Sequence, residues 1–327
     1  MEEKNTTFSP PRPIQAILSG FDIVATHLEL LLFPIVLDLW LWLGPHMRLR
    51  TLLQPMMAQA MTALQAYASD QPDVLAATTQ IWQDLMQRQN LFSVLRTYPV
   101  GVPSLMNTRL PMLTPWGAAP EMEVSSWGMA FTLWLGLSVL GILLGAGMFL
   151  LLAQTVNQKP LLPWPAALKR WRHASMHTLA LSVLWMASSM VIVFPLALMS
   201  ILPGGSGQVA AFCFGILFLW LLLPFLFSAH GIFLNGQPFW VSIWSGVRMV
   251  RLALPAAGLF FLYAFVISRG LDMLWSIPEA DSWFSLVGVI GHAVTSTALL
   301  TASFVLYRDI EQWIRQMEAH LADRQML

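Results

Sequence analysis

The sequence predicts an all-α membrane protein with six transmembrane helices, and three observations support this fold class. First, 57% of the 327 residues are hydrophobic, only 10% are charged and 15 are Trp, which does not describe a water-soluble surface. Second, six stretches are long and apolar enough to cross about 30 Å of hydrocarbon. Third, Lys and Arg gather in the connections on one side of those stretches.

The ends of the chain and its charge set further bounds. The start, "MEEKNTTFSPPRP", has mixed charge and no apolar core, so we expect residues 1–13 to be a flexible N-terminus and not a signal peptide. Residues 14–327 are expected to form one transmembrane helical domain. Lys plus Arg equal Asp plus Glu at 17 each, so no net charge points to a nucleic acid. The single cysteine, Cys213, rules out a disulfide framework within the chain.

The predicted spans follow the apolar runs in chain order. They cover residues 24–43, 129–153, 178–202, 209–234, 252–274 and 285–307. The second, third and fourth contain no Asp, Glu, Lys or Arg, as expected for the interior of a bilayer.

The distribution of basic residues predicts that both termini are cytoplasmic, in a cell membrane. With that orientation the short outer loops "GGSGQ" and "SIPEADSW" carry no Lys or Arg. The outer basic residues then all fall in one long loop, where charge matters less. Arg48 and Arg50, directly after the first span, support the inverse orientation.

A weak internal repeat supports the same layout. "AILSGFDIV" (residues 16–24) and "SIWSGVRMV" (242–250) precede the first and fifth spans, and "AALKRWRHASMH" (166–177) precedes the third. Each begins shortly after a proline, a residue suited to a first helical turn. We therefore predict three hairpins, each preceded by an amphipathic helix on the cytoplasmic surface.

This pattern resembles poorly characterised bacterial multi-pass proteins, among them the membrane domain associated with some glycerophosphodiester phosphodiesterases. The resemblance rests on "SIWSGVRMVRLALPAAGLFF" and its counterparts "AILSGFDIVATHLELLLFP" and "AALKRWRHASMHTLALSVLW". It implies a bacterial inner-membrane protein. The soluble phosphodiesterase module is absent from this sequence, so the resemblance implies no catalytic residue.

Two segments lie outside the predicted spans. Residues 45–126 contain two amphipathic runs followed by five prolines from Tyr98 to Pro120, and we expect an extracytoplasmic insertion that caps the bundle or the membrane face. Residues 308–327 are expected to form an amphipathic C-terminal surface helix.

The first predicted span carries two acids, Glu29 and Asp38, and a histidine, His27. Charged groups are costly inside hydrocarbon, so each acid must be protonated, near water or partnered. The two acids lie about 180° apart around a helix and cannot form one site on it alone. They mark either interfacial positions or a polar route, the latter through Glu29 with His27 or with another helix.

The last two spans add His292, Arg269 and Asp272. Arg269 and Asp272 are spaced to pair on one helix, and His292 is either a hydrogen-bonded structural residue or a proton-handling one. Small residues around His292 favour tight helix packing, as does "GILLG" at Gly141 and Gly145, a weak indication of a homodimer.

Five basic residues in the predicted surface helices are candidates for contact with anionic lipid headgroups: Lys169, Arg170, Arg172, Arg248 and Arg251. We found no catalytic motif, metal site or phosphate-binding loop, so the sequence predicts neither an enzyme nor a cofactor. The favoured function is non-enzymatic organisation of lipids or partner proteins in the membrane. The alternative is a small transporter or channel with a polar route near Glu29, Asp38 and His292.

Overall fold

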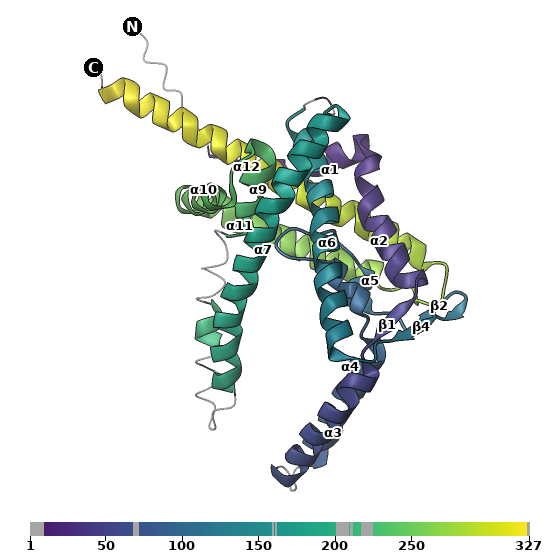
Figure 1. Cartoon of the computed structure of the whole chain (residues 1–327). Coiled ribbons are helices and arrows are strands. Elements are labelled where there is room, and N and C mark those ends of the chain that lie inside the picture. Colours follow the sequence, from purple (N-terminus) through teal and green to yellow (C-terminus); the bar gives the residue numbers. More distant parts are fainter. Residues whose placement is uncertain are drawn as a thin grey trace.

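The computed structural model describes residues 10–67, 72–158, 160, 162–200, 209, 212–216 and 225–325, and most of them are helical (Figure 1). The expected flexible N-terminus therefore lies largely outside the described residues. The long helices are α6 (Trp127–Val156), α7 (Trp164–Ser200), α11 (Leu254–Trp275) and α12 (Ser285–Gln325). Shorter ones are α1 (Pro13–Thr26), η1 (Leu28–Leu31), α2 (Leu32–Leu43), α9 (Ser228–Asn235) and α10 (Phe239–Leu252).

Four described helices are long and apolar enough to cross a membrane. They are Trp127–Val156, Trp164–Pro195, Leu254–Trp275 and Ser285–Asp323. A fifth candidate is a broken one, made of α1 together with η1 and α2. The helical class and the candidate spans agree with the sequence. Residues 210, 211 and 217–224 of the predicted span 209–234 lie outside the described residues, and its last part lies in α9.

The predicted first span, 24–43, is wrong at its N-terminal end. The chain turns by 95° between α1 and the helix that follows it. The hydroxyl of Thr26 donates to the carbonyls of Asp22 and Ile23, and His27 leaves helical geometry at φ −132° and ψ 68°. Local side-chain bonds of this kind compete with continuation of a helix. The apolar character of residues 24–43 as a whole did not indicate this turn.

Contact between α1 and α12 explains the direction of the turn. The buried face of α1 consists of Ala16, Ile17, Gly20 and Val24. A Cβ at Gly20 would lie 2.4 Å from the carbonyl oxygen of Ala298 and 2.7 Å from the Cβ of Ala302. The two helices therefore cross almost backbone to backbone, an arrangement that small residues permit.

The three predicted surface helices have different outcomes. α10 is separate from α11, because Pro255 starts a new helix after Ala253. Residues 166–177 instead form the first part of continuous α7, since no Pro or Gly interrupts them. The expected C-terminal helix is the last part of α12, which runs through residue 308 without a break.

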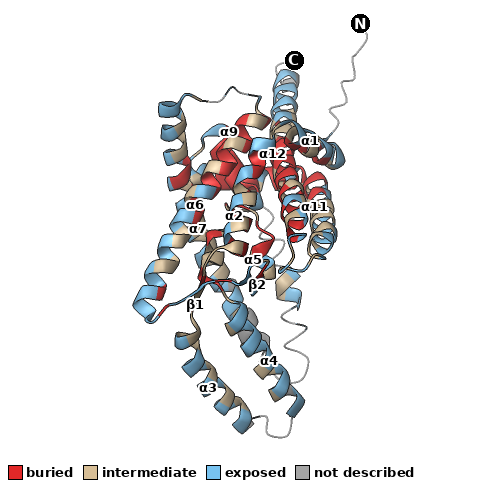
Figure 2. Ribbon diagram, turned by 90° about the vertical axis from the view of Figure 1, so that its right-hand side faces the viewer, coloured by how far each residue is buried: buried red, intermediate tan, exposed pale blue. Residues whose placement is uncertain are grey.

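Residues 46–89 and 110–126 form a structure at one end of the bundle that we call the platform. Strand β1 (His46–Arg48) pairs in parallel with β4 (Glu121–Glu123), and β2 (Leu113–Thr114) pairs with β3 (Gly117–Ala118). Within the platform, helices α3 (Arg50–Tyr67) and α4 (Pro72–Arg88) form a hairpin that projects away from the bundle. None of their described side chains is buried (Figure 2). The two amphipathic helices were predicted; their projection away from the bundle was not.

Gly20→Ala tests the close crossing. The new methyl group would meet backbone atoms of α12, so we expect a loss of about 1–3 kcal/mol of stability, the usual cost of overpacking. Thermal unfolding of the purified protein in detergent measures it. The control is Gly258→Ala in α11, where an added Cβ meets nothing within 4 Å. Equal unfolding midpoints for the two variants would contradict the crossing.

Candidate functional site

An inserted segment, residues 90–106, enters the helical bundle. It begins with η2 (Leu91–Leu95) and ends at the one-turn helix α5 (Met106–Arg109). A Cβ at Gly141 would lie 2.4 Å from the carbonyl oxygen of Leu95, and one at Gly145 would lie 2.8 Å from the Cα of Gly101. Both glycines are near the middle of α6. The sequence predicted a cap, but this segment packs against α6 inside the bundle. The glycine pair, considered as a homodimer contact, packs against the inserted segment of the same chain.

Asp38 of α2 holds the end of the inserted segment. Its carboxylate accepts hydrogen bonds from Ser104 Oγ at 2.5 Å, from the Leu105 amide at 3.1 Å and from the Met106 amide at 2.9 Å. Asp38 is fully buried. A non-helical backbone is tolerated at membrane depth only where such partners are supplied. Asp38 is thus enclosed by the protein, and its carboxylate is occupied by these three donors.

Glu29 and His27 lie elsewhere, at the turn between α1 and η1. Glu29 is exposed, and its carboxylate makes no hydrogen bond or ion pair to any described residue. His27 is half-buried, and its Nδ1 lies 3.0 Å from Thr26 Oγ1 and 3.1 Å from the Ile23 carbonyl. The structure does not bring Glu29 to Asp38 or His292.

His292 contacts Asp272 on α11. The distance from Nδ1 to Oδ1 is 2.8 Å, and His292 also lies within electrostatic reach of Asp38. Asp272 therefore pairs with His292 and not, as the sequence had suggested, with Arg269. Arg269 instead stacks over the ring of Phe265. The structure therefore places His292 of α12 beside Asp272 of α11.

The small residues near His292 serve packing, as predicted. Trp275 fits against Gly288 and Gly291, where added Cβ atoms would collide with its carbonyl and its ring. The Trp275 indole also donates to Thr295 Oγ1 at 3.2 Å.

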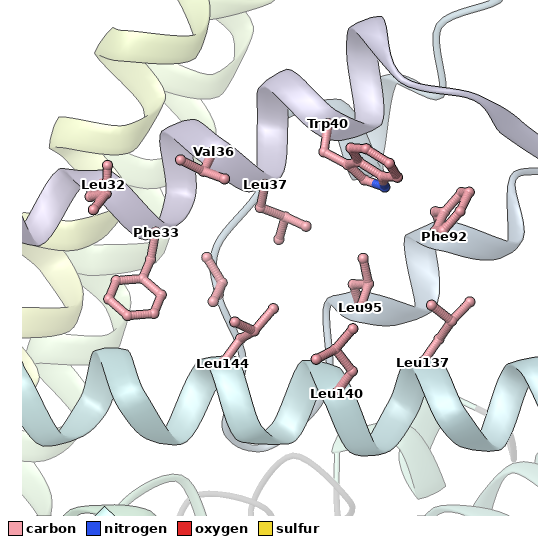
Figure 3. A pocket seen from close by; sticks show the side chains of 11 residues that line it. Leu32, Phe33, Val36, Leu37, Trp40, Phe92, Leu95, Leu137, Leu140 and Leu144 are labelled. Carbon is pink, nitrogen blue, oxygen red and sulfur yellow. The ribbon is translucent and has the colours of Figure 1, made fainter. Parts of the chain in front are cut away.

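An apolar groove of about 410 Å³ runs between α2 and α6 (Figure 3). Side chains of the two helices point toward each other across it, and the inserted segment closes one part of it. The lining residues are all apolar: Leu32, Phe33, Val36, Leu37, Trp40, Phe92, Leu95, Val102, Leu137, Leu140 and Leu144. Sequence reasoning missed this groove, because its lining comes from three segments that an apolar pattern cannot pair.

The five candidate lipid-contacting residues divide into two groups. Arg170 is half-buried and donates to the carbonyls of Phe233 and Leu234 at the end of α9, and Arg248 pairs with Glu318 of α12. Lys169, Arg172 and Arg251 are exposed. Arg248 is exposed as well but already pairs with a carboxylate, so three of the five are exposed without such a partner among the described residues.

The platform contains a buried arginine that sequence reasoning did not single out as a site. Arg48 is 1% exposed and bonds through all three guanidinium nitrogens: to Glu121 at 3.0 Å, to the Gln89 carbonyl at 2.5 Å and to His46 Nδ1 at 3.1 Å. Burial, together with the charge of Arg48, lowers the pKa of His46. Burial alone would raise the pKa of Glu121, but Arg48 and Arg50 outweigh it and lower that pKa.

His173 and His177 are 3.1 Å apart between their Nε2 atoms. Among the described residues, no group of three or more His, Cys, Asp or Glu side chains is placed to hold a metal ion.

Comparison with protein-family models, curated proteins and solved structures finds no match to this chain. The resemblance to bacterial multi-pass proteins therefore stays a prediction.

Asp38→Asn tests the anchor. Asn offers one acceptor oxygen, and its NH₂ group opposes the amide donors, so we expect a loss of about 1.5–3 kcal/mol locally. The amides of Leu105 and Met106 should then exchange hydrogen at least about tenfold faster. Hydrogen exchange with mass spectrometry measures this. Glu29→Gln is the matched acid control and should leave both amides at the wild-type rate; unchanged exchange in Asp38→Asn would refute the anchor.

The pKa directions predict that acid weakens the platform. Below about pH 6.5 the unfolded chain protonates His46 while the folded protein keeps it neutral, so stability falls as pH decreases. Loss of the Glu121 contribution follows at lower pH, as that carboxylate is protonated through its lowered folded-state pKa.

We expect the thermal unfolding midpoint to decrease between pH 7.5 and 5.5, and this decrease to shrink in His46→Gln. His27→Gln, at the turn after α1, should keep the wild-type pH dependence. The same dependence in His46→Gln would show that another group titrates.

Proposed function

We propose that this chain is a non-enzymatic, multi-pass membrane protein that organises lipids by holding an acyl chain in the groove between α2 and α6. The proposal includes six spans with both termini in the cytoplasm of a bacterial cell. Four candidate spans, and a fifth broken one, support it. The groove is the observation that carries the lipid assignment.

An alkyl chain matches the chemistry of the groove. Its eleven lining residues are all apolar. Each buried methylene contributes about 0.8 kcal/mol, while a polar ligand would lose its hydrogen bonds to water without replacement. Because α2 and α6 both belong to candidate spans, a chain can enter from the bilayer without crossing water.

The accessible basic residues are suited to contact with lipid headgroups. Lys169 and Arg172 on α7 and Arg251 on α10 are exposed and near helix starts or ends expected at the cytoplasmic surface. Each such residue contributes about 1 kcal/mol of attraction to an anionic membrane surface. The bilayer itself, with anionic headgroups, is therefore the proposed partner; a membrane-protein partner or homodimer has no further support.

A transporter with a polar route remains the alternative, and the approach of His292 to Asp38 and Asp272 favours it. It has less support than lipid binding. The Asp38 carboxylate is occupied by three donors, and Glu29 lies about 13 Å along the helical segment from Asp38 at about 1.5 Å per residue.

Leu140→Trp tests lipid binding by filling the groove. Loss of contact with about three methylenes should weaken binding by roughly fiftyfold. Native mass spectrometry of protein extracted in mild detergent measures the fraction that retains lipid. That fraction should fall severalfold in the variant.

Leu135→Trp is the matched control, because Leu135 lies on the same helix, is similarly exposed and does not line the groove. It should retain lipid as the wild type does. A wild-type protein free of lipid, or equal retention in both variants, would refute the proposal.

A further inference from the structure

The platform contains a second cavity, of about 440 Å³, that differs in chemistry from the groove. It lies among α3, α4 and the ends of β1 and β4. Six of its eight lining residues are polar or charged: Arg48, Arg50, Gln54, Gln83, Gln87 and Glu121, with Met86 and Met112 beside them. Polar groups at this density are suited to a ligand that arrives from water.

The two arginines of this cavity are in different states. Arg48 is buried, and every one of its guanidinium nitrogens has a partner. Arg50 is 43% exposed along its side chain, and only its Nη2 has a partner, Glu121 Oε1 at 3.2 Å. The Nε atom of Arg50 is enclosed and has no acceptor among the described residues. Arg50 thus has donor capacity that the protein does not use.

The charge of the cavity is also unbalanced. Arg48 and Arg50 share the single carboxylate of Glu121, since both bond to the same oxygen. Among the described residues no other acid lines the cavity, so this lining carries one net positive charge. A bound group with one negative charge would balance it and accept from Arg50. The three glutamine amides can bond to further polar atoms, and the two methionines can cover a short apolar part.

We propose that the platform cavity binds a small organic monocarboxylate, with the carboxylate at Arg50 and the remainder between α3 and α4. This site is independent of lipid binding in the groove. A bound molecule would contact both helices of the hairpin near its base, where Arg50 and Gln54 come from α3 and Gln83 and Gln87 from α4.

The test titrates butyrate into the full-length protein in detergent at constant ionic strength, and ligand-observed saturation-transfer NMR measures binding. We expect saturable binding that Arg50→Gln weakens at least tenfold. Gln83→Leu, which keeps both arginines, should weaken it severalfold. Arg88→Gln is the matched control, because Arg88 is an exposed arginine at the end of α4 outside the cavity lining, and it should bind butyrate as the wild type does.

Further arms separate the alternatives. Inorganic phosphate that binds more tightly than butyrate would overturn the carboxylate assignment, and so would the absence of saturable butyrate binding. Equal affinity in Arg50→Gln and the wild type would overturn the site. Leu140→Trp should lose lipid and keep butyrate binding, so failure of the lipid proposal and failure of this one give different results. Unchanged hydrogen exchange at Met47 and Arg48 in Arg50→Gln confirms that the platform remains folded.

Discussion

The carboxylate of Asp38 is the constraint on which the centre of the structure depends. A chain that leaves helical geometry inside an apolar bundle exposes amide groups that lipid cannot satisfy. Asp38 accepts from two such amides and from Ser104, and these donors in turn compensate a charge that would otherwise be costly to bury. Without this exchange the end of the inserted segment would carry unsatisfied amides inside the bundle, which would destabilise the groove wall that Leu95 and Val102 provide.

Small residues allow segments of the chain to approach the helices closely at several other places. Gly141 and Gly145 admit the inserted segment, Gly20 admits α12, and Gly288 and Gly291 admit Trp275. Between membrane helices the apolar driving force is weak, so close van der Waals contact determines which helices meet. These glycines therefore lie where two segments of the chain must approach closely. At Gly128 and Gly136, by contrast, an added Cβ would meet no other atom within 4 Å.

The sequence predicted the helical membrane class and several spans, because long apolar runs determine these locally. It also predicted α3, α4 and the packing around His292. It could not predict the turn at His27, since the signal there is a tertiary contact of Gly20 with α12. Asp38 was singled out for the right physical reason, the cost of a buried acid, yet its partners lie 66 to 68 residues away along the chain. The groove and the cavity at Arg50 likewise depend on pairings between distant segments.

The unbroken course of α12 has a mechanical consequence. Its 41 residues form a rod of about 60 Å, held near its start by the 276–284 loop, which Trp42 and Arg109 bind, and crossed by α1 near Ala298 and Ala302. The crossing with α1 is the point about which α12 would tilt. About 35 Å of helix lies beyond it, so a tilt of about 5° would displace the far end by about 3 Å. The position of the 276–284 loop and the position of the C-terminal arm are thus coupled through one rigid helix.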